Sequence, residues 1–140
     1  MGKINVGRVI LGGLVAGVVV NIGEFVLNDP VLGQDWAAAM QSLNRSEFSG
    51  NAITLFIVLG FILGIASVWT YAAIRPRFGA GPKTALCAGL LAWFFGYFYA
   101  GIGMYATGLF PTKLAVAPIL WGLVQVPLAT VAGASLYKEA

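Results

Sequence analysis

Residues 52–74 read AITLFIVLGFILGIASVWTYAAI, a run that contains no charged residue. A helix needs roughly 20 residues at 1.5 Å each to cross the hydrocarbon core of a bilayer. The run meets that length and is too long for one strand. It also lacks the alternation of lipid-facing and lumen-facing residues that a membrane barrel requires. It therefore predicts a membrane-spanning helix.

Three further apolar runs of similar length occur along the chain. We expect the four spans at about residues 8–27, 52–74, 84–109 and 113–137, in a single membrane domain over residues 1–140. The composition agrees, with 59% hydrophobic and 9% charged residues and a mean hydropathy of +0.88. Soluble domains contain about a quarter charged residues. The predicted fold class is an all-α membrane protein with four transmembrane helices.

Prolines and small polar residues mark the expected ends of the spans. We expect Pro76 to end the second span, because the residue before a proline avoids the helical region. Pro82 is expected in the first turn of the third span. Thr112 is a candidate N-cap of the fourth span, and Ser49 or Asn51 is a candidate N-cap of the second.

The charged residues predict the orientation. The link between the first two spans holds three acids, Asp29, Asp35 and Glu47, and one cation, Arg45. Most other cations lie near the chain ends or in the link between the second and third spans. They are Lys3, Arg8, Arg75, Arg77, Lys83 and Lys138. Because short cytoplasmic segments carry an excess of Lys and Arg, both termini are predicted to be cytoplasmic (N-in/C-in). We expect a multi-pass protein of a bacterial inner membrane.

The first outer link is long enough to hold a short helix. Asp35 would cap a helix over residues 35–44, in which Trp36, Met40 and Leu43 share one face. The interpretation is an interfacial helix that lies on the outer leaflet. The alternatives are a loop folded over the mouth of the bundle and a lid over a site.

Small residues recur along each span at helical spacing. In lipid, helices associate where small residues let their backbones approach, so these positions predict packing faces. They indicate a tight four-helix bundle, although some of them would equally serve contacts with other chains. The residues are Gly13 and Gly17 in the first span, Gly60 and Gly64 in the second, Ala92, Gly96 and Ala100 in the third, and Gly122 in the fourth.

Aromatic residues concentrate in the third span, around the sequence Trp93-Phe94-Phe95. Such a surface would suit bound lipid, a pigment or a quinone. Lipid-facing and bundle-filling aromatics need no ligand, and this interpretation is preferred. The chain has no histidine, which removes the usual axial ligand for haem. No cofactor is expected, and bound lipid, a pigment or a quinone along the third span stay open as alternatives.

Glu24 is the best candidate for a functional ionisable group within a span. It shares a face of the first span with Gly17 and Asn21. We expect it to pair with Lys113 or Arg45, or to reach interfacial water. The alternative is a role in the passage of an ion or substrate.

Two more polar side chains lie inside the expected spans. Asn21 is expected to meet a tyrosine hydroxyl, such as that of Tyr97, and the backbone carbonyl freed by Pro118. Gln125 lies two residues before Pro127 and would hydrogen-bond across helices or serve a transporter gate. The polar candidates are therefore Asn21, Glu24, Gln125 and Lys113.

The sequence contains no recognisable catalytic set. Without histidine no Ser-His-Asp or Cys-His arrangement can form, and Cys87 is the single cysteine. Phosphate-binding and metal-ligand motifs are also missing from the sequence. We expect no enzymatic activity, and the dispersed cations give no nucleic-acid-binding stripe.

The four-helix layout, the acidic end of the first span (NIGEFVLN, residues 21–28) and Trp36 in the outer link resemble the small uncharacterised four-helix inner-membrane proteins of many bacteria. The resemblance implies a fold and a location but no activity. Two functions remain. The first is a structural or accessory subunit that packs against other membrane proteins or itself. The second is a protomer of a small oligomeric transporter or channel that uses Glu24, Asn21 and Gln125.

Overall fold

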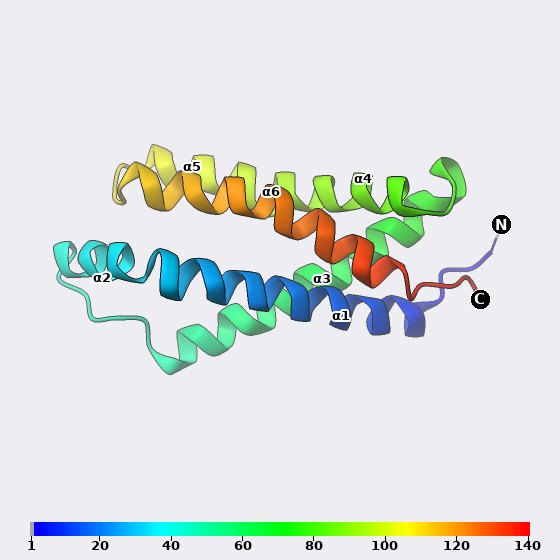
Figure 1. Cartoon of the computed structure of the whole chain (residues 1–140), viewed down its shortest axis with the longest axis horizontal. Helices are drawn as coiled ribbons and strands as arrows, with labels where there is room; N and C mark the ends of the chain where they lie inside the picture. Colours follow the sequence, from blue (N-terminus) through cyan, green and yellow to red (C-terminus); the bar gives the residue numbers. More distant parts are fainter. Residues whose placement is uncertain (1) are drawn as a thin grey trace.

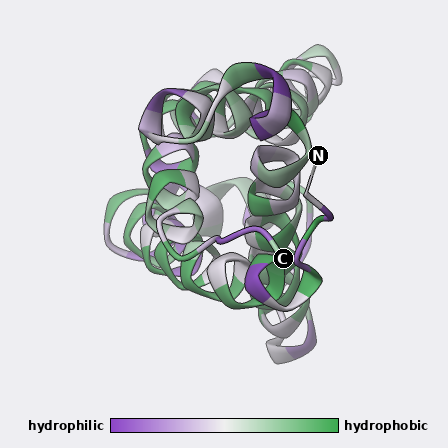
Figure 2. Ribbon diagram, turned by 90° about the vertical axis from the view of Figure 1, so that its right-hand side faces the viewer, coloured by the Kyte–Doolittle hydropathy of each residue, from purple (hydrophilic) through white to green (hydrophobic). Residues whose placement is uncertain are grey.

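A computed structural model of the chain describes residues 2–140, and these contain helices and no strand. Four helical segments are long and apolar enough to cross a membrane, which confirms the expected number and type of spans. They are Val6–Val31, Gly50–Phe78, Pro82–Ala106 and Thr112–Ala134. Large hydrophobic side chains are exposed along all four, as expected for helices surrounded by lipid. Hydrophobic residues recur along the ribbon of every helix, with hydrophilic ones between them (Figure 2).

The helices run back and forth along one long axis, and both chain ends lie at the same end of the molecule (Figure 1). α1 packs against α3 and α6, and α6 also packs against α4 and α5. α6 therefore lies at the centre of the arrangement. The elements are α1 (Val6–Val26), η1 (Leu27–Val31), α2 (Gly33–Ser42), α3 (Gly50–Phe78), α4 (Pro82–Trp93), η2 (Phe94–Tyr99), α5 (Ala100–Ala106) and α6 (Thr112–Ala134).

Close backbone approaches hold α1 between its two neighbours. A Cβ on Gly64 of α3 would collide with the backbone of Gly13 and Gly17 in α1. A Cβ on Gly12 would likewise collide with the carbonyl of Gly133 in α6. In lipid such contacts stabilise a bundle through van der Waals packing rather than through the removal of apolar surface from water.

The predicted end of the second span was wrong. α3 continues through Pro76 to Phe78. The proline costs one backbone hydrogen bond but the next turn forms again, because Gly79 N–H donates to Arg75 O at 2.8 Å. The helix stops at Gly79, where φ is +85°, a conformation that glycine adopts without strain. Its start is capped by Ser49, whose hydroxyl accepts from Ala52 N–H at 3.2 Å.

Other boundaries also differ from those expected. The first helix continues past residue 27 as the π-helical turn η1, closed by Leu32 N–H to Leu27 O at 2.8 Å. α4 begins at Pro82 as expected, but the third span ends at Ala106 rather than 109, shortly before Gly108 at φ +67°. Thr112 is the first residue of α6 and caps nothing with its side chain. α6 ends at Ala134, and the chain turns so that Tyr137 is buried.

The short helix of the first link is α2, and it begins two residues before the expected position. Asp35 therefore lies within its first turn and is not its cap. Ala39 and the partly buried Trp36 pack with Leu27, Leu32 and Leu114 at the end of the bundle opposite the chain termini (Figure 1). α2 thus rests on the ends of α1 and α6.

Candidate functional site

Glu24 of α1 lies at the centre of a cluster of neutral hydrogen-bond donors. Its Oε1 accepts from the Tyr97 hydroxyl at 2.5 Å and from Gln125 Nε2 at 2.9 Å. Its Oε2 accepts from Asn28 Nδ2 at 3.0 Å. Three chain segments that are remote in sequence, α1 with η1, η2 and α6, therefore meet at one carboxyl group. We call these four residues the Glu24 cluster.

Two tryptophans extend the cluster. Trp121 Nε1 donates to Gln125 Oε1 at 2.7 Å, and Trp36 Nε1 donates to Asn28 Oδ1 at 2.9 Å. Each amide oxygen is therefore engaged by an indole, which turns each amide NH₂ toward Glu24. The Gln125 amide also donates to the Tyr97 oxygen at 3.1 Å. The polar hydrogens of the cluster thus converge on the carboxyl group.

Both π-helical segments of the described chain carry a member of the cluster. η1 carries Asn28, and η2 carries Tyr97. A π-helical turn is rare and occurs frequently at functional sites. In η2 only Tyr97 is partly buried, while its neighbours are exposed. The irregular turns therefore bring polar side chains to Glu24.

Two glycines make room for the cluster. A Cβ on Gly122 of α6 would lie 2.6 Å from the Tyr97 ring, and a Cβ on Gly23 would collide with the Gln125 amide. Gly122 was expected at a packing face, and it lies directly against the Tyr97 ring. Gly23 was not singled out from the sequence.

The predicted ion pair of Glu24 was wrong. Lys113 Nζ lies 2.8 Å from Asp35 Oδ2 of α2, and Arg45 is exposed. Lys113 occupies the first turn of α6, beside α2, so Asp35 is the acid within its reach. Glu24 takes part in neither ion pair found among residues 2–140.

Asn21 lies apart from the Glu24 cluster, which corrects the expected contact with Pro118 and a tyrosine. Its Nδ2 donates to Ile57 O of α3 at 3.2 Å. A Cβ on Gly60 would collide with its side chain. Asn21 and Glu24 therefore contact different neighbours of α1. Asn21 points toward α3 and Glu24 toward η2 and α6, because α1 lies between these helices.

The expected packing positions fall into two groups. Gly13, Gly17, Gly60, Gly64 and Gly122 lie in close contact with a neighbouring helix, as a Cβ added to any of them would collide. The small-residue packing face expected on the third span is largely exposed instead. Ala92 is partly buried, whereas Gly96 and Ala100 are exposed, and a Cβ on Gly96 would meet only Leu63 at 3.7 Å. Within the chain, α4 packs on α6 through Gly89 against Pro127 instead.

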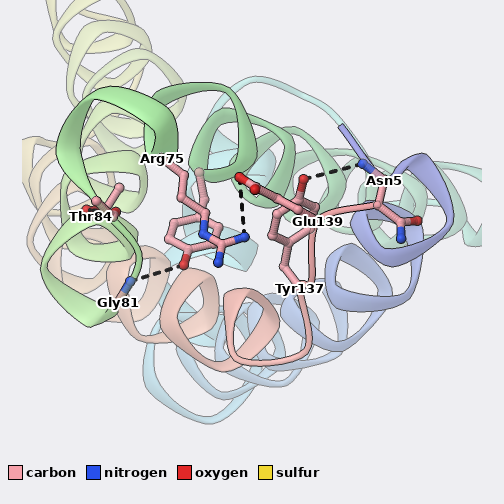
Figure 3. Close-up of polar contacts among 8 residues, drawn as sticks. Asn5, Arg75, Gly81, Thr84, Tyr137 and Glu139 are labelled. Carbon is pink, nitrogen blue, oxygen red and sulfur yellow. Dashed lines mark hydrogen bonds and ion pairs between the residues drawn. The ribbon is translucent and has the colours of Figure 1, made fainter. Parts of the chain in front are cut away.

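A second polar group lies at the end that holds the chain termini (Figure 3). Arg75 of α3 lies 3.5 Å from Glu139 and stacks over the Tyr137 ring, with its guanidinium carbon 5.5 Å from the ring centroid. The Tyr137 hydroxyl accepts from Asn5 N–H at 3.3 Å. The side chains of the C-terminal segment therefore tie α3 to the residues that precede α1.

Sequence reasoning missed Asn28, Trp36 and Trp121. The spacing contained a usable signal for two of them, because Asn28 follows Glu24 by four residues and Trp121 precedes Gln125 by four. Trp36 had been placed only on an interfacial face. No spacing rule connects it to Asn28, because the π-helical turn between them sets the contact.

The Glu24 cluster can hold a negative charge through neutral hydrogen-bond donors. Within residues 2–140, no three His, Cys, Asp or Glu side chains lie close enough together to hold a metal ion. Comparisons with known protein families, curated proteins and solved structures gave no match.

Proposed function

We propose that the chain is a structural or accessory subunit of a larger membrane assembly. The main support for this proposal is the side of the third span that is exposed on the surface of the chain. η2 and α5 contain no buried residue. Gly96, Ala100 and Gly103 follow one another at helical spacing along them, and all three are exposed.

An exposed glycine in a membrane helix has a cost. It lowers helix propensity by about 1 kcal/mol relative to alanine and buries nothing within its own chain. A partner helix that approaches closely along such a face gains van der Waals contacts. The exposed rings of Phe95 and Tyr99 would add further contact area. A protein partner explains this combination better than lipid alone.

The proposal places the chain in a bacterial inner membrane with both termini in the cytoplasm. The clustering of cations near the end that holds both termini supports this orientation. α2 would then lie at the outer surface as an interfacial helix, with its Trp36 face turned to the bundle. No cofactor is proposed beyond lipid, a pigment or a quinone along the third span, and no enzymatic activity is proposed.

Native mass spectrometry of the full chain, extracted in gentle detergent from its own membrane, tests the subunit proposal. The wild type should be released with a fixed set of other subunits. Ala100→Leu adds bulk to the exposed face and should release the chain alone. Ala66→Leu adds the same bulk on an exposed position of α3 and should leave the assembly intact. Equal behaviour of the two variants contradicts the proposal.

The contact between Glu24 and Gln125 favours a second candidate, the protomer of a small oligomeric transporter or channel. The two side chains were expected to share a pathway, and they lie 2.9 Å apart. Under this proposal the extracted protein is a defined homo-oligomer, and Glu24→Gln abolishes flux in liposomes. Asn21→Leu should reduce flux less than Glu24→Gln does, because Asn21 faces α3. Unchanged flux in Glu24→Gln rejects this candidate.

A further inference from the structure

We infer that Glu24 is a proton-binding site within the membrane and that Asn28 and Trp36 transmit its charge state to α2. The residues involved are the Glu24 cluster and Trp36. None of them belongs to the exposed small residues Gly96, Ala100 and Gly103, so the proton site is independent of the proposed assembly.

The arrangement of hydrogens fits an ionised carboxyl group. Tyr97 has one polar hydrogen, and it points to Glu24 Oε1. The two hydrogens of Gln125 Nε2 go to Glu24 and Tyr97, and Asn28 Nδ2 donates to the carboxyl and to the backbone carbonyl of Glu24. A carboxylate accepts all of these bonds, whereas a carboxylic acid needs an acceptor for its own hydrogen.

No charged side chain compensates this carboxylate within the described residues. The groups that face it are Asn28 from η1, Tyr97 from η2 and Gln125 from α6. Only Tyr97 among these is titratable. Lys113 pairs with Asp35 instead. A carboxylate within a span that no cation compensates is expensive, so a cation that binds from outside would stabilise the site.

The geometry selects a proton over larger cations. A metal ion needs several oxygen ligands, but the amide oxygens of Asn28 and Gln125 face indole N–H groups. An organic cation needs space, and the cluster is tightly packed at Gly23 and Gly122. A proton needs only a lone pair on the carboxylate.

The proton is expected to bind at Oε2. Oε1 accepts two hydrogen bonds, whereas Oε2 accepts only that of Asn28. A hydronium ion at the α2 end transfers its proton to Oε2 and remains as a water molecule, which accepts from the new hydroxyl group. The bond from Asn28 Nδ2 to the carboxyl group weakens, because an acid accepts less strongly than a carboxylate, while Nδ2 keeps its bond to the Glu24 backbone carbonyl. Asn28 is then held less firmly, and its contact with Trp36 of α2 weakens. The docking of α2 therefore depends on the charge of Glu24.

Carbodiimide labelling tests the proton site, because these reagents modify protonated carboxyl groups in apolar surroundings. Dicyclohexylcarbodiimide is applied to the full chain in lipid nanodiscs over a range of pH, and peptide mass spectrometry locates the adduct. Labelling of Glu24 should rise as the pH falls. The other carboxyl side chains, Asp29, Asp35, Glu47 and Glu139, serve as internal references.

The matched variants are Tyr97→Phe and Tyr99→Phe. The first removes a donor to the carboxylate and should increase labelling of Glu24 about tenfold at a pH where the wild type is mostly ionised. The second removes an exposed hydroxyl, since Tyr99 is 71% exposed, and should change nothing. Absence of labelling at every pH, or equal labelling in Tyr97→Phe and wild type, overturns the proton site.

Hydrogen–deuterium exchange tests the link to α2 separately. Glu24→Gln removes the charge permanently, so amides of residues 33–42 should exchange several-fold faster than in the wild type at the same pH. Asn28→Leu removes the link itself and should produce the same change with the Glu24 carboxyl group still present. Unchanged exchange in both variants overturns the transmission to α2. The exchange of α4 serves as the reference for the intact fold.

Discussion

The Tyr97 hydroxyl lies 2.5 Å from Oε1 of Glu24, although the two residues are 73 positions apart in the chain. This bond joins the π-helical turn of the third span to the first span. Gln125 of α6 completes the junction from the other side at 2.9 Å. The polar side chains of the membrane region thus connect helices that otherwise meet only through small and apolar residues.

Gln125→Leu should destabilise the bundle. The variant leaves the indole N–H of Trp121 without its partner and removes one donor from Glu24, and the site is only 7% exposed. We expect a loss of about 1–2 kcal/mol in the free energy of unfolding, measured in mixed micelles with increasing denaturing detergent. Gln41→Leu, at an exposed position of α2, is the control. Equal losses would contradict the structural role of Gln125.

Gly64→Ala and Gly103→Ala should have opposite effects on the stability of the isolated chain. A Cβ on Gly64 collides with the backbone of α1, and we expect a loss of about 1–3 kcal/mol. A Cβ on Gly103 meets nothing within 4 Å and should stabilise its helix by up to about 1 kcal/mol. The same unfolding assay compares the two variants. A neutral Gly64→Ala would mean that α1 and α3 are not in close contact.

Lys113→Ala should change stability little. The ion pair with Asp35 is largely exposed, with 60% of the lysine side chain and 35% of the aspartate side chain accessible. Exposed pairs contribute at most about 1 kcal/mol. The difference from wild type should shrink further when unfolding is repeated at high salt. A loss well above that range at both salt concentrations would show a different role for Lys113.

The sequence was sufficient to predict the spans, because hydropathy and length depend on local composition alone. The sequence was insufficient to predict the residues at which the spans begin and end. Pro76 was expected to stop α3, yet the last turn tolerates a missing hydrogen bond and Gly79 ends the helix instead. The π-helical turns were not predicted either. η1 contains Pro30 and five of the six residues of η2 are aromatic, but neither feature is specific to a π-helix.

The candidate site was predicted only in part. Glu24 and Gln125 stood out because polar side chains are rare in the spans, and they do meet. Their partners depend on how the helices rotate about their axes, which small-residue patterns leave open. Charge matching likewise could not decide between Glu24 and Asp35 for Lys113, because all three lie toward the same end of the bundle.

Tyr137→Leu should loosen the end that holds the chain termini. The ring of Tyr137 stacks under Arg75 and packs edge-on against Tyr71, with the two rings 5.9 Å apart. Loss of these contacts is worth about 1 kcal/mol. Hydrogen–deuterium exchange of residues 2–5 and 135–140 should rise in this variant. Tyr137→Phe keeps the ring and loses only the hydrogen bond from Asn5 N–H, so exchange at residues other than Asn5 should stay close to wild type. Equal exchange in both variants would count against the ring contacts.

The most direct test of the Glu24 cluster is a double-mutant cycle of Glu24→Leu and Tyr97→Phe on the free energy of unfolding. Because the two side chains share a charge-assisted hydrogen bond, we predict a coupling energy of about 1–3 kcal/mol. The parallel cycle with Tyr99→Phe should give additive losses, since Tyr99 is exposed. Additive losses for Glu24 and Tyr97 as well would contradict the account, because the two groups would then not interact in the folded protein.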